Sequence, residues 1–144
     1  MTKIDFHILA SHQDIERLQY VARLVMKAQA RGHDILIACA SAEQSKAVSQ
    51  ALWAARADAF LAHTEIDQAA HSLQLSHTDD CGTHHDILIN LCEQVPSYFS
   101  RFIRVFEVVS QQPDLLESSR ARYRYYQDRG YELNRHDLRQ RMPQ

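Results

Sequence analysis

The chain has 144 residues, of which 45% are hydrophobic and 24% are charged, and its formal net charge is −2. This length suits one domain with one core, and the composition excludes disordered and collagen-like classes. No apolar run reaches the roughly 20 residues of a membrane span, and the first residues turn polar too early for a signal peptide, so we expect a cytoplasmic protein. The three cysteines have no repeated spacing, which predicts free thiols.

The first half of the chain predicts two strand-helix units. Residues 3–10 (KIDFHILA) are strand-like, and residues 11–32 carry apolar side chains at helical spacing, with Gly32 placed to end the helix. The continuous apolar run at 35–37 predicts a strand that is covered on both faces. A serine capping signal then opens a second helix over residues 41–53.

The second half is less regular. The polar stretch 54–85 predicts a long surface loop with short strand pieces around residues 60–61. Residues 85–91 (HDILINL) repeat the earlier apolar run and predict a second buried strand. Apolar residues at helical spacing predict a helix over 97–110, and a proline and a glycine bound a last helix over 113–129.

This order of elements predicts a Rossmann-like α/β fold. We expect a single three-layer α/β/α domain over residues 1–134, with a mainly parallel central sheet, and a polar C-terminal tail over residues 135–144. A nucleotide site at the first strand-helix turn needs glycines, and that turn (LASHQD) has none. We therefore expect neither a nucleotide site nor a cofactor.

A metal site is a second possibility for the loop around residue 84. Cys81 and His84 have the spacing of half a zinc site, with His85 beside them, but Cys92 would have to complete it from just past a buried strand. We favour a polar loop that carries no metal. No local pattern marks a catalytic triad or a Cys-His pair, so an enzymatic function has no support from the residues.

Positive charge is concentrated at one end of the chain. Residues 120–144 contain seven arginines and three acidic residues, a local charge of +4, which leaves −6 for the remainder. An acidic body resists broad adhesion to nucleic acid, whereas a confined basic end indicates a small anionic partner.

The last helix divides into two sides at 100° per residue. The packing side holds Leu115, Ser119 and Tyr126, and the outward side holds Arg120, Tyr123, Arg124 and Gln127. Guanidinium groups beside an aromatic ring suit a carboxylate or phosphate that carries a ring of its own. A solvated arginine-rich face and a site for single-stranded nucleic acid are the alternatives.

The only tryptophan, Trp53, lies at the end of the second helix, seven residues before Phe60. Core packing is the ordinary reading of two such aromatic residues in a small domain. A protein-binding patch is the alternative, because aromatic side chains are strong interface anchors and the residues between these two are small.

The whole pattern resembles the chi subunit family of bacterial DNA polymerase III. The resemblance rests on the order and spacing of DFHIL, ILIAC, ALWAARADAFLAH, DILINL, FEVV and RARYRYYQDRGYELN along the chain. It implies an α/β/α domain without catalytic activity, cofactor or metal. Residues 64–84 match poorly, so no function is carried onto them.

The resemblance also implies two partners. Trp53 and Phe60 match positions that contact psi, the small subunit that joins chi to the clamp loader. Arg120, Tyr123 and Arg124 match positions that receive the acidic C-terminal tail of the single-stranded DNA-binding protein, with Arg124 in place of a common lysine. A family contact that is usually apolar is Gln112 here.

We therefore expect a non-catalytic adaptor between the clamp loader and the single-stranded DNA-binding protein, with no direct role in binding DNA. A direct single-strand binder that uses the same helix is the first alternative. A small nucleotide- or metal-dependent α/β enzyme is the second.

Overall fold

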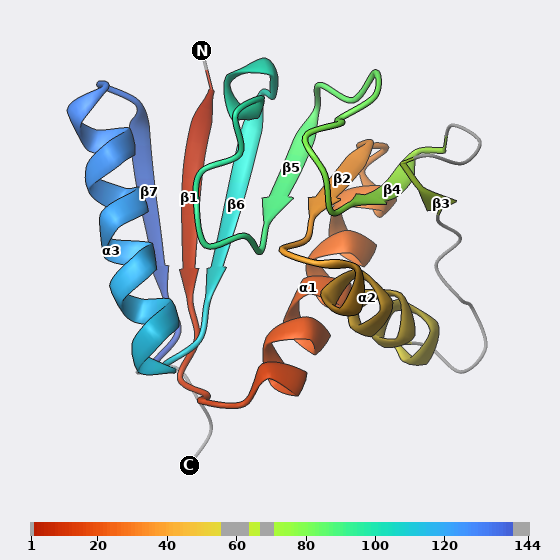
Figure 1. Cartoon of the computed structure of the whole chain (residues 1–144), viewed down its shortest axis with the longest axis horizontal. Coiled ribbons are helices and arrows are strands. Elements are labelled where there is room, and N and C mark those ends of the chain that lie inside the picture. Colours follow the sequence, from red (N-terminus) through yellow and green to blue (C-terminus); the bar gives the residue numbers. More distant parts are fainter. Residues whose placement is uncertain (1, 56–63, 67–70, 140–144) are drawn as a thin grey trace.

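The computed structural model describes residues 2–55, 64–66 and 71–139 (Figure 1). Its helices are α1 (Asp14–Ala30), α2 (Ala42–Ala54) and α3 (Pro113–Asp128), with a short 3₁₀ turn, η1 (Phe99–Arg101). Its strands are β1 (Lys3–Ile8), β2 (Ile35–Ala38), β3 (Thr64–Glu65), β4 (Leu73–Ser76), β5 (Ile87–Asn90), β6 (Arg104–Val109) and β7 (Glu132–Asp137). No helix in these ranges is long and apolar enough to cross a membrane.

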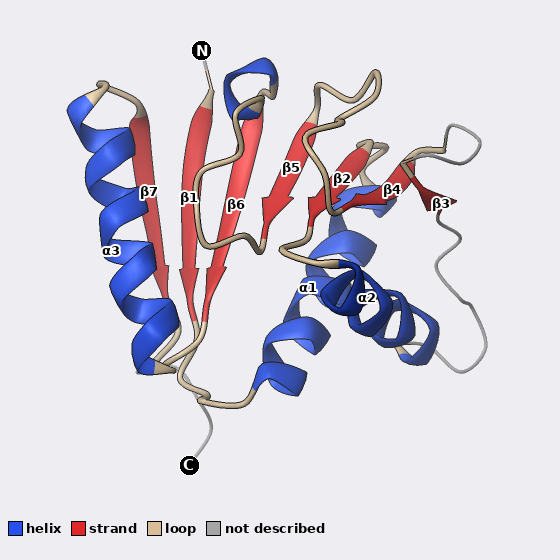
Figure 2. Cartoon of the chain, in the orientation of Figure 1, coloured by secondary structure: helices blue, strands red, loops and turns tan. Residues whose placement is uncertain are grey.

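The described strands form one parallel sheet in the order β3-β4-β2-β5-β6-β1-β7 (Figure 2). The two similar apolar runs of the sequence are direct neighbours in it, since Ile35 is in register with Ile87 and Ile37 with Ile89. The prediction that both runs are parallel strands is confirmed. β1 lies between β6 and β7, so the first strand of the chain pairs with the last two.

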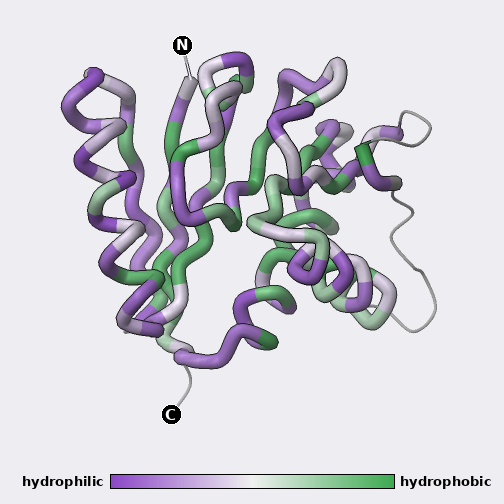
Figure 3. The backbone as a smooth tube through the Cα atoms, in the orientation of Figure 1, coloured by the Kyte–Doolittle hydropathy of each residue, from purple (hydrophilic) through white to green (hydrophobic). Residues whose placement is uncertain are grey.

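Helices cover both faces of the sheet, and the three-layer architecture is confirmed. Alternate residues of β2 point into two separate cores: Ile35 and Ile37 pack with α1 and α2, whereas Leu36 and Ala38 belong to the core that includes α3. This burial on both faces explains why β2 and β5 are continuous apolar runs. Figure 3 shows hydrophobic colour along the central strands and hydrophilic stretches along α3.

The helix ends follow the expected signals. The Ser41 hydroxyl accepts a hydrogen bond of 3.1 Å from the backbone N–H of Gln44, which caps α2. Gly32 and Gly130 follow α1 and α3 with φ of 82° and 77°. A side chain at either position would be strained, so glycine ends both helices as predicted.

The predicted helix over residues 97–110 is wrong. The chain forms η1 and then β6, which pairs on one side with β5 and on the other with β1. Its apolar spacing resembled a helix because the end of β6 is buried on both faces: the last three residues, 107–109, are all buried. Three valines in this strand favour the extended conformation.

The loop predicted over residues 54–85 is also partly wrong. It contains β4, whose four residues are all buried and which pairs with β2 and β3. The polar side chains of Gln74 and Ser76 are hydrogen-bonded inside the protein. Because they are polar, hydropathy did not indicate that this segment is a buried strand. The strand pieces expected at residues 60–61 lie outside the described residues.

The last strand, β7, extends beyond residue 134, where we expected the domain to end. β7 continues to Asp137, which is in register with Ile8 of β1, and the backbone N–H of Leu138 donates to the carbonyl of Ile8. The first residues of the expected polar tail are therefore part of the sheet.

Candidate functional site

The final helix is anchored to the sheet by a buried ion pair. Arg122 Nε donates to Glu107 Oε1 at 2.9 Å, and both side chains are almost fully buried. Glu107 Oε2 accepts hydrogen bonds from the Tyr126 hydroxyl at 2.8 Å and from Asn90 Nδ2 at 2.9 Å. A second Arg122 nitrogen donates to the carbonyl of Glu93 at 2.8 Å. Both carboxylate oxygens of Glu107 are thus paired.

This network sets the rotation of α3 about its own axis. Arg122 and Tyr126 are one turn apart and point inward, so Arg120 and Arg124, two positions away from Arg122, point outward. Burial and the neighbouring Glu107 carboxylate raise the pKa of the Tyr126 phenol, which keeps it a neutral donor. The sequence argument placed Tyr126 on the packing side correctly, but it did not single out Arg122.

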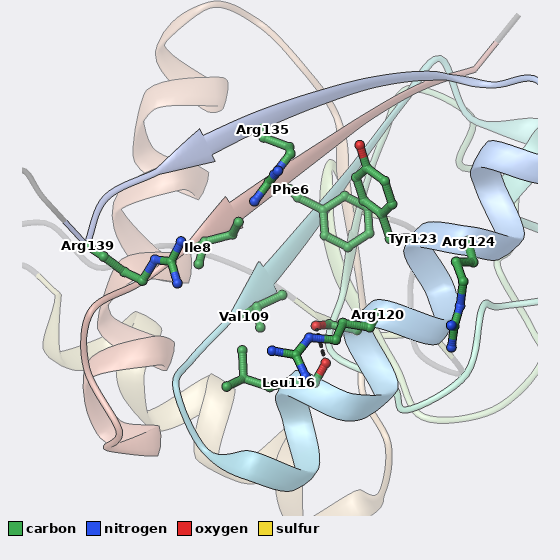
Figure 4. A pocket seen from close by; sticks show the side chains of 10 residues that line it. Phe6, Ile8, Val109, Leu116, Arg120, Tyr123, Arg124, Arg135 and Arg139 are labelled. Carbon is green, nitrogen blue, oxygen red and sulfur yellow. Dashed lines mark hydrogen bonds between the residues drawn. The ribbon is translucent and has the colours of Figure 1, made fainter.

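An open pocket of about 390 Å³ lies between α3 and the carboxyl-terminal ends of the strands (Figure 4). Its lining residues are Phe6 and Ile8 of β1, Val109 of β6, Leu116, Ser119, Arg120, Tyr123 and Arg124 of α3, Arg135 of β7, and Arg139. The structure therefore brings together all three residues of the predicted tail-binding set, which are Arg120, Tyr123 and Arg124.

The floor of this pocket is apolar. Phe6 and Val109 are buried, and Leu116 is partly buried against the same core. The Tyr123 ring packs edge-on against Phe6, with 5.2 Å between ring centroids and 61° between ring planes. Tyr123 is consequently half-buried and forms a wall of the pocket, rather than standing free on an outward face. Such a surface suits an apolar or aromatic group.

The rim of the pocket is cationic. Arg120 and Arg124 project from α3, while Arg135 and Arg139 approach from the β7 side (Figure 4). Arg139 is paired with Asp137, and no ion pair among the described residues involves the other three. Three guanidinium groups are therefore available to an anion from outside.

Arg135 and Arg139 were missed because we placed residues 135–144 in a tail. Residues 132–137 (ELNRHD) contain one strongly apolar side chain, since β7 is an edge strand with little core contact. The alternation of side chains along a strand could have indicated Arg135. Leu133 packs on the core beneath α3, and Arg135, two residues further along β7, lies on the same face and lines the pocket.

Gln112, which the resemblance placed at a usually apolar contact, does not line the pocket. It is the N-cap residue of α3, and its carbonyl accepts a hydrogen bond from the backbone N–H of Leu116. Val109 and Leu116 supply the apolar wall near it.

The second predicted site is on the other face of the sheet. Trp53 lies on α2 with 57% of its surface exposed, so it is not a core residue. Phe60 lies outside the described residues, and so the predicted pairing of the two rings has no geometry here. α2 packs on the face of the sheet opposite α3.

Two of the four residues considered for a metal site, His84 and Cys81, make other contacts. His84 Nε2 lies 2.9 Å from Gln74 Oε1, and Cys81 Sγ lies 3.2 Å from an Arg101 guanidinium nitrogen. Burial raises the pKa of the Cys92 thiol to about 11, which disfavours the thiolate that a metal needs. The described ranges contain no group of three or more potential metal ligands.

Comparison with known proteins gives consistent matches over nearly the whole chain. Residues 1–134 match the family model described as DNA polymerase III chi subunit, HolC. The chain is 33% identical over 139 residues to DNA polymerase III subunit chi of Pseudomonas aeruginosa, covering 96% of this chain and 98% of that protein. It is 27% identical over 142 residues to the Escherichia coli subunit chi, covering 93% and 97%, and 23% identical over 133 residues to that of Haemophilus influenzae, covering 90% and 92%.

Proposed function

This chain belongs to the DNA polymerase III chi subunit family, and from that premise we propose that it links two partners of the replication machinery. Family membership confirms the resemblance and makes the chain a non-catalytic accessory subunit of replication. The finer proposal is that the pocket beneath α3 binds the acidic C-terminal tail of the single-stranded DNA-binding protein. Trp53 and Phe60 belong to the surface that binds the psi subunit of the clamp loader.

The tail proposal rests on one observation: arginines that have no ion-pair partner in the described part of the protein surround an apolar pocket floor. Arg120, Arg124 and Arg135 would bind carboxylates through paired N–H groups, for which the guanidinium geometry is suited. A phenylalanine ring at the end of the tail would pack against Phe6 and Tyr123. A disordered acidic segment with a terminal ring and carboxylate matches both parts of the pocket.

Charge also explains how such a segment would reach the pocket. The acidic body of the chain repels a negatively charged tail except near residues 120–144, where the net charge is positive. Ordering the tail on docking costs conformational entropy, so we expect modest affinity. The contacts lie at the surface, so added salt should weaken binding.

The two proposed sites lie on opposite faces of the sheet, which supports simultaneous binding of both partners. The pocket is formed on the α3 face, and Trp53 is on α2, which covers the other face. A subunit that holds the clamp loader on one face and the tail on the other would raise the local concentration of the polymerase on coated single strands.

Reversing one charge of the rim tests the tail site. Arg124→Glu is expected to weaken binding of a labelled acidic tail peptide about tenfold, because it removes a cation and adds a repelling carboxylate. Fluorescence anisotropy would measure the affinity. Arg129→Glu makes the same charge change five residues further on, at the C-cap of α3 and outside the pocket lining, and should alter the affinity far less.

Two further measurements distinguish the two proposed binding sites from each other and from direct binding of single-stranded nucleic acid. Trp53→Ala should retain peptide binding while it weakens capture of psi. Equal peptide affinities for wild type and Arg124→Glu would remove the proposed site. Tight binding of naked oligonucleotide, without any response to the peptide, would instead favour a direct single-strand binder.

A further inference from the structure

One arginine of the pocket differs from the others in having an internal partner. The Asp137 carboxylate accepts from Arg139 Nε at 2.9 Å through Oδ1 and from a terminal guanidinium nitrogen at 2.5 Å through Oδ2. Oδ1 also accepts from the backbone N–H of Arg139 at 3.1 Å. Two donors of the fork are therefore filled by a carboxylate of the protein itself.

We infer that Asp137 is an internal competitor of the acidic ligand, and that Arg139 binds only ligands that bring a further carboxylate, beyond those held by Arg120, Arg124 and Arg135, to displace Asp137. This inference rests on the proposed function of the pocket. It assigns unequal roles to four arginines that line one site: three are open to the first carboxylate that arrives, and the fourth takes part only after an exchange.

The exchange is balanced in charge and in the hydrogen bonds of the guanidinium group, and the backbone N–H of Arg139, which also leaves Asp137, is satisfied by water. A ligand carboxylate that replaces Asp137 on Arg139 makes the same paired contact, and the released Asp137 carboxylate returns to water. Arg139 is exposed and Asp137 is partly exposed, so neither side chain is enclosed by packing and the exchange costs little desolvation. The hydrogen bonds from Arg139 lower the pKa of Asp137 to about 2, so the carboxylate competes as an anion throughout the neutral range.

The consequence is discrimination between acidic tails and simple anions. A single carboxylate gains nothing from Arg139, because it finds unpaired guanidinium groups on Arg120, Arg124 and Arg135 first. A run of aspartates can occupy those groups and still offer a further carboxylate. Asp137 also lowers the positive potential of the pocket, which weakens the binding of every anion, so ligands with few charges bind poorly.

Asp137→Asn tests the inference, since asparagine keeps the size of the side chain and removes its charge. Two peptides of equal length would be titrated by anisotropy, one with several aspartates and one with those aspartates changed to asparagine. We expect Asp137→Asn to bind the acidic peptide about two- to fivefold more tightly, the scale of an exposed ion pair. Adding Arg139→Gln to Asp137→Asn should abolish this gain.

Matched controls make the outcomes distinct. Glu132→Gln removes a carboxylate from the same strand, but Glu132 does not line the pocket, so it should change the affinity much less. In the wild type, Arg139→Gln should weaken the acidic peptide much more than the single-carboxylate peptide, which loses only the general attraction of one cation. Unchanged or weaker binding by Asp137→Asn would overturn the inference, because Asp137 would then be idle or would position Arg139 for the ligand. Failure of the wild type to bind the acidic peptide would contradict the proposed function itself.

Discussion

Replacing Arg122 by methionine is expected to lower the free energy of unfolding by about 3–5 kcal/mol. The substitution leaves the Glu107 carboxylate, which has no exposed surface, without its cation inside the protein. Asn90 and Tyr126 still donate to one of its oxygens, but hydrogen bonds from neutral groups do not replace a buried counter-ion. The loop carbonyl of Glu93 also loses its donor.

Urea unfolding followed by circular dichroism would measure this loss. Arg120→Met is the matched control on the same helix, and it should cost about 0.5 kcal/mol or less because Arg120 is exposed. Changing Glu107 to leucine together with Arg122→Met removes both charges and should recover part of the stability. A cost below about 1 kcal/mol for Arg122→Met would show that the pair does not anchor α3.

Acid is expected to destabilise the protein through His7, by about 3 kcal/mol in total between pH 6.5 and about pH 4. His7 is buried between β6 and β7, its Nδ1 lies 2.7 Å from the Tyr20 hydroxyl, and its ring stacks on His136 at 4.7 Å. Burial, and then the charge of His136, lower the pKa of His7 from 6.5 to about 4, although Asp5 acts in the opposite direction.

The sign follows from which state binds the proton. Below pH 6.5 His7 is protonated in the unfolded chain but neutral in the folded chain. The free energy of unfolding therefore decreases as the pH is lowered from 6.5 to about 4, below which both states are protonated. Unfolding in urea at several pH values would measure the slope. His7→Asn keeps an acceptor for the Tyr20 hydroxyl and should flatten it.

His12→Asn is the control for this experiment, because His12 is exposed in the loop after β1 and its removal should leave the slope unchanged. The slope in His7→Asn should not vanish, since burial also lowers the pKa of His84. An equal slope in wild type and His7→Asn would contradict this role of His7.

The parts of the fold that could be predicted are those where local pattern and burial agree. β2 and β5 are continuous apolar runs that are buried on both faces of the sheet, and β2 also lies between two helices, so both strands are unambiguous. β6 failed because a strand that is buried on both faces can have apolar residues at any spacing, including that of a helix. The prediction missed β4 because its polar side chains are hydrogen-bonded to the loop that follows it, Ser76 to the carbonyl of Asp80 and Gln74 to His84, and hydropathy alone does not reveal such contacts.

The candidate site was predictable on one side only. Arg120, Tyr123 and Arg124 share a helix, so their spacing alone brings them together. Arg135 and Arg139 reach the same pocket because β7 returns to pair with β1, a long-range contact that no local pattern contains. Arg122 looked like one more surface arginine, and only the position of Glu107 on the adjacent strand β6 buries it.

The central claim is that the pocket beneath α3 binds an acidic, ring-terminated tail, and two-dimensional NMR of the nitrogen-15-labelled protein tests it most directly. Titration with the tail peptide is predicted to shift the backbone amides of Leu116, Arg120, Tyr123 and Arg135, which line the pocket. Amides on α2, on the opposite face of the sheet, should stay unchanged. Shifts confined to α1 and α2, or no shifts at a peptide concentration that saturates binding, would contradict the account.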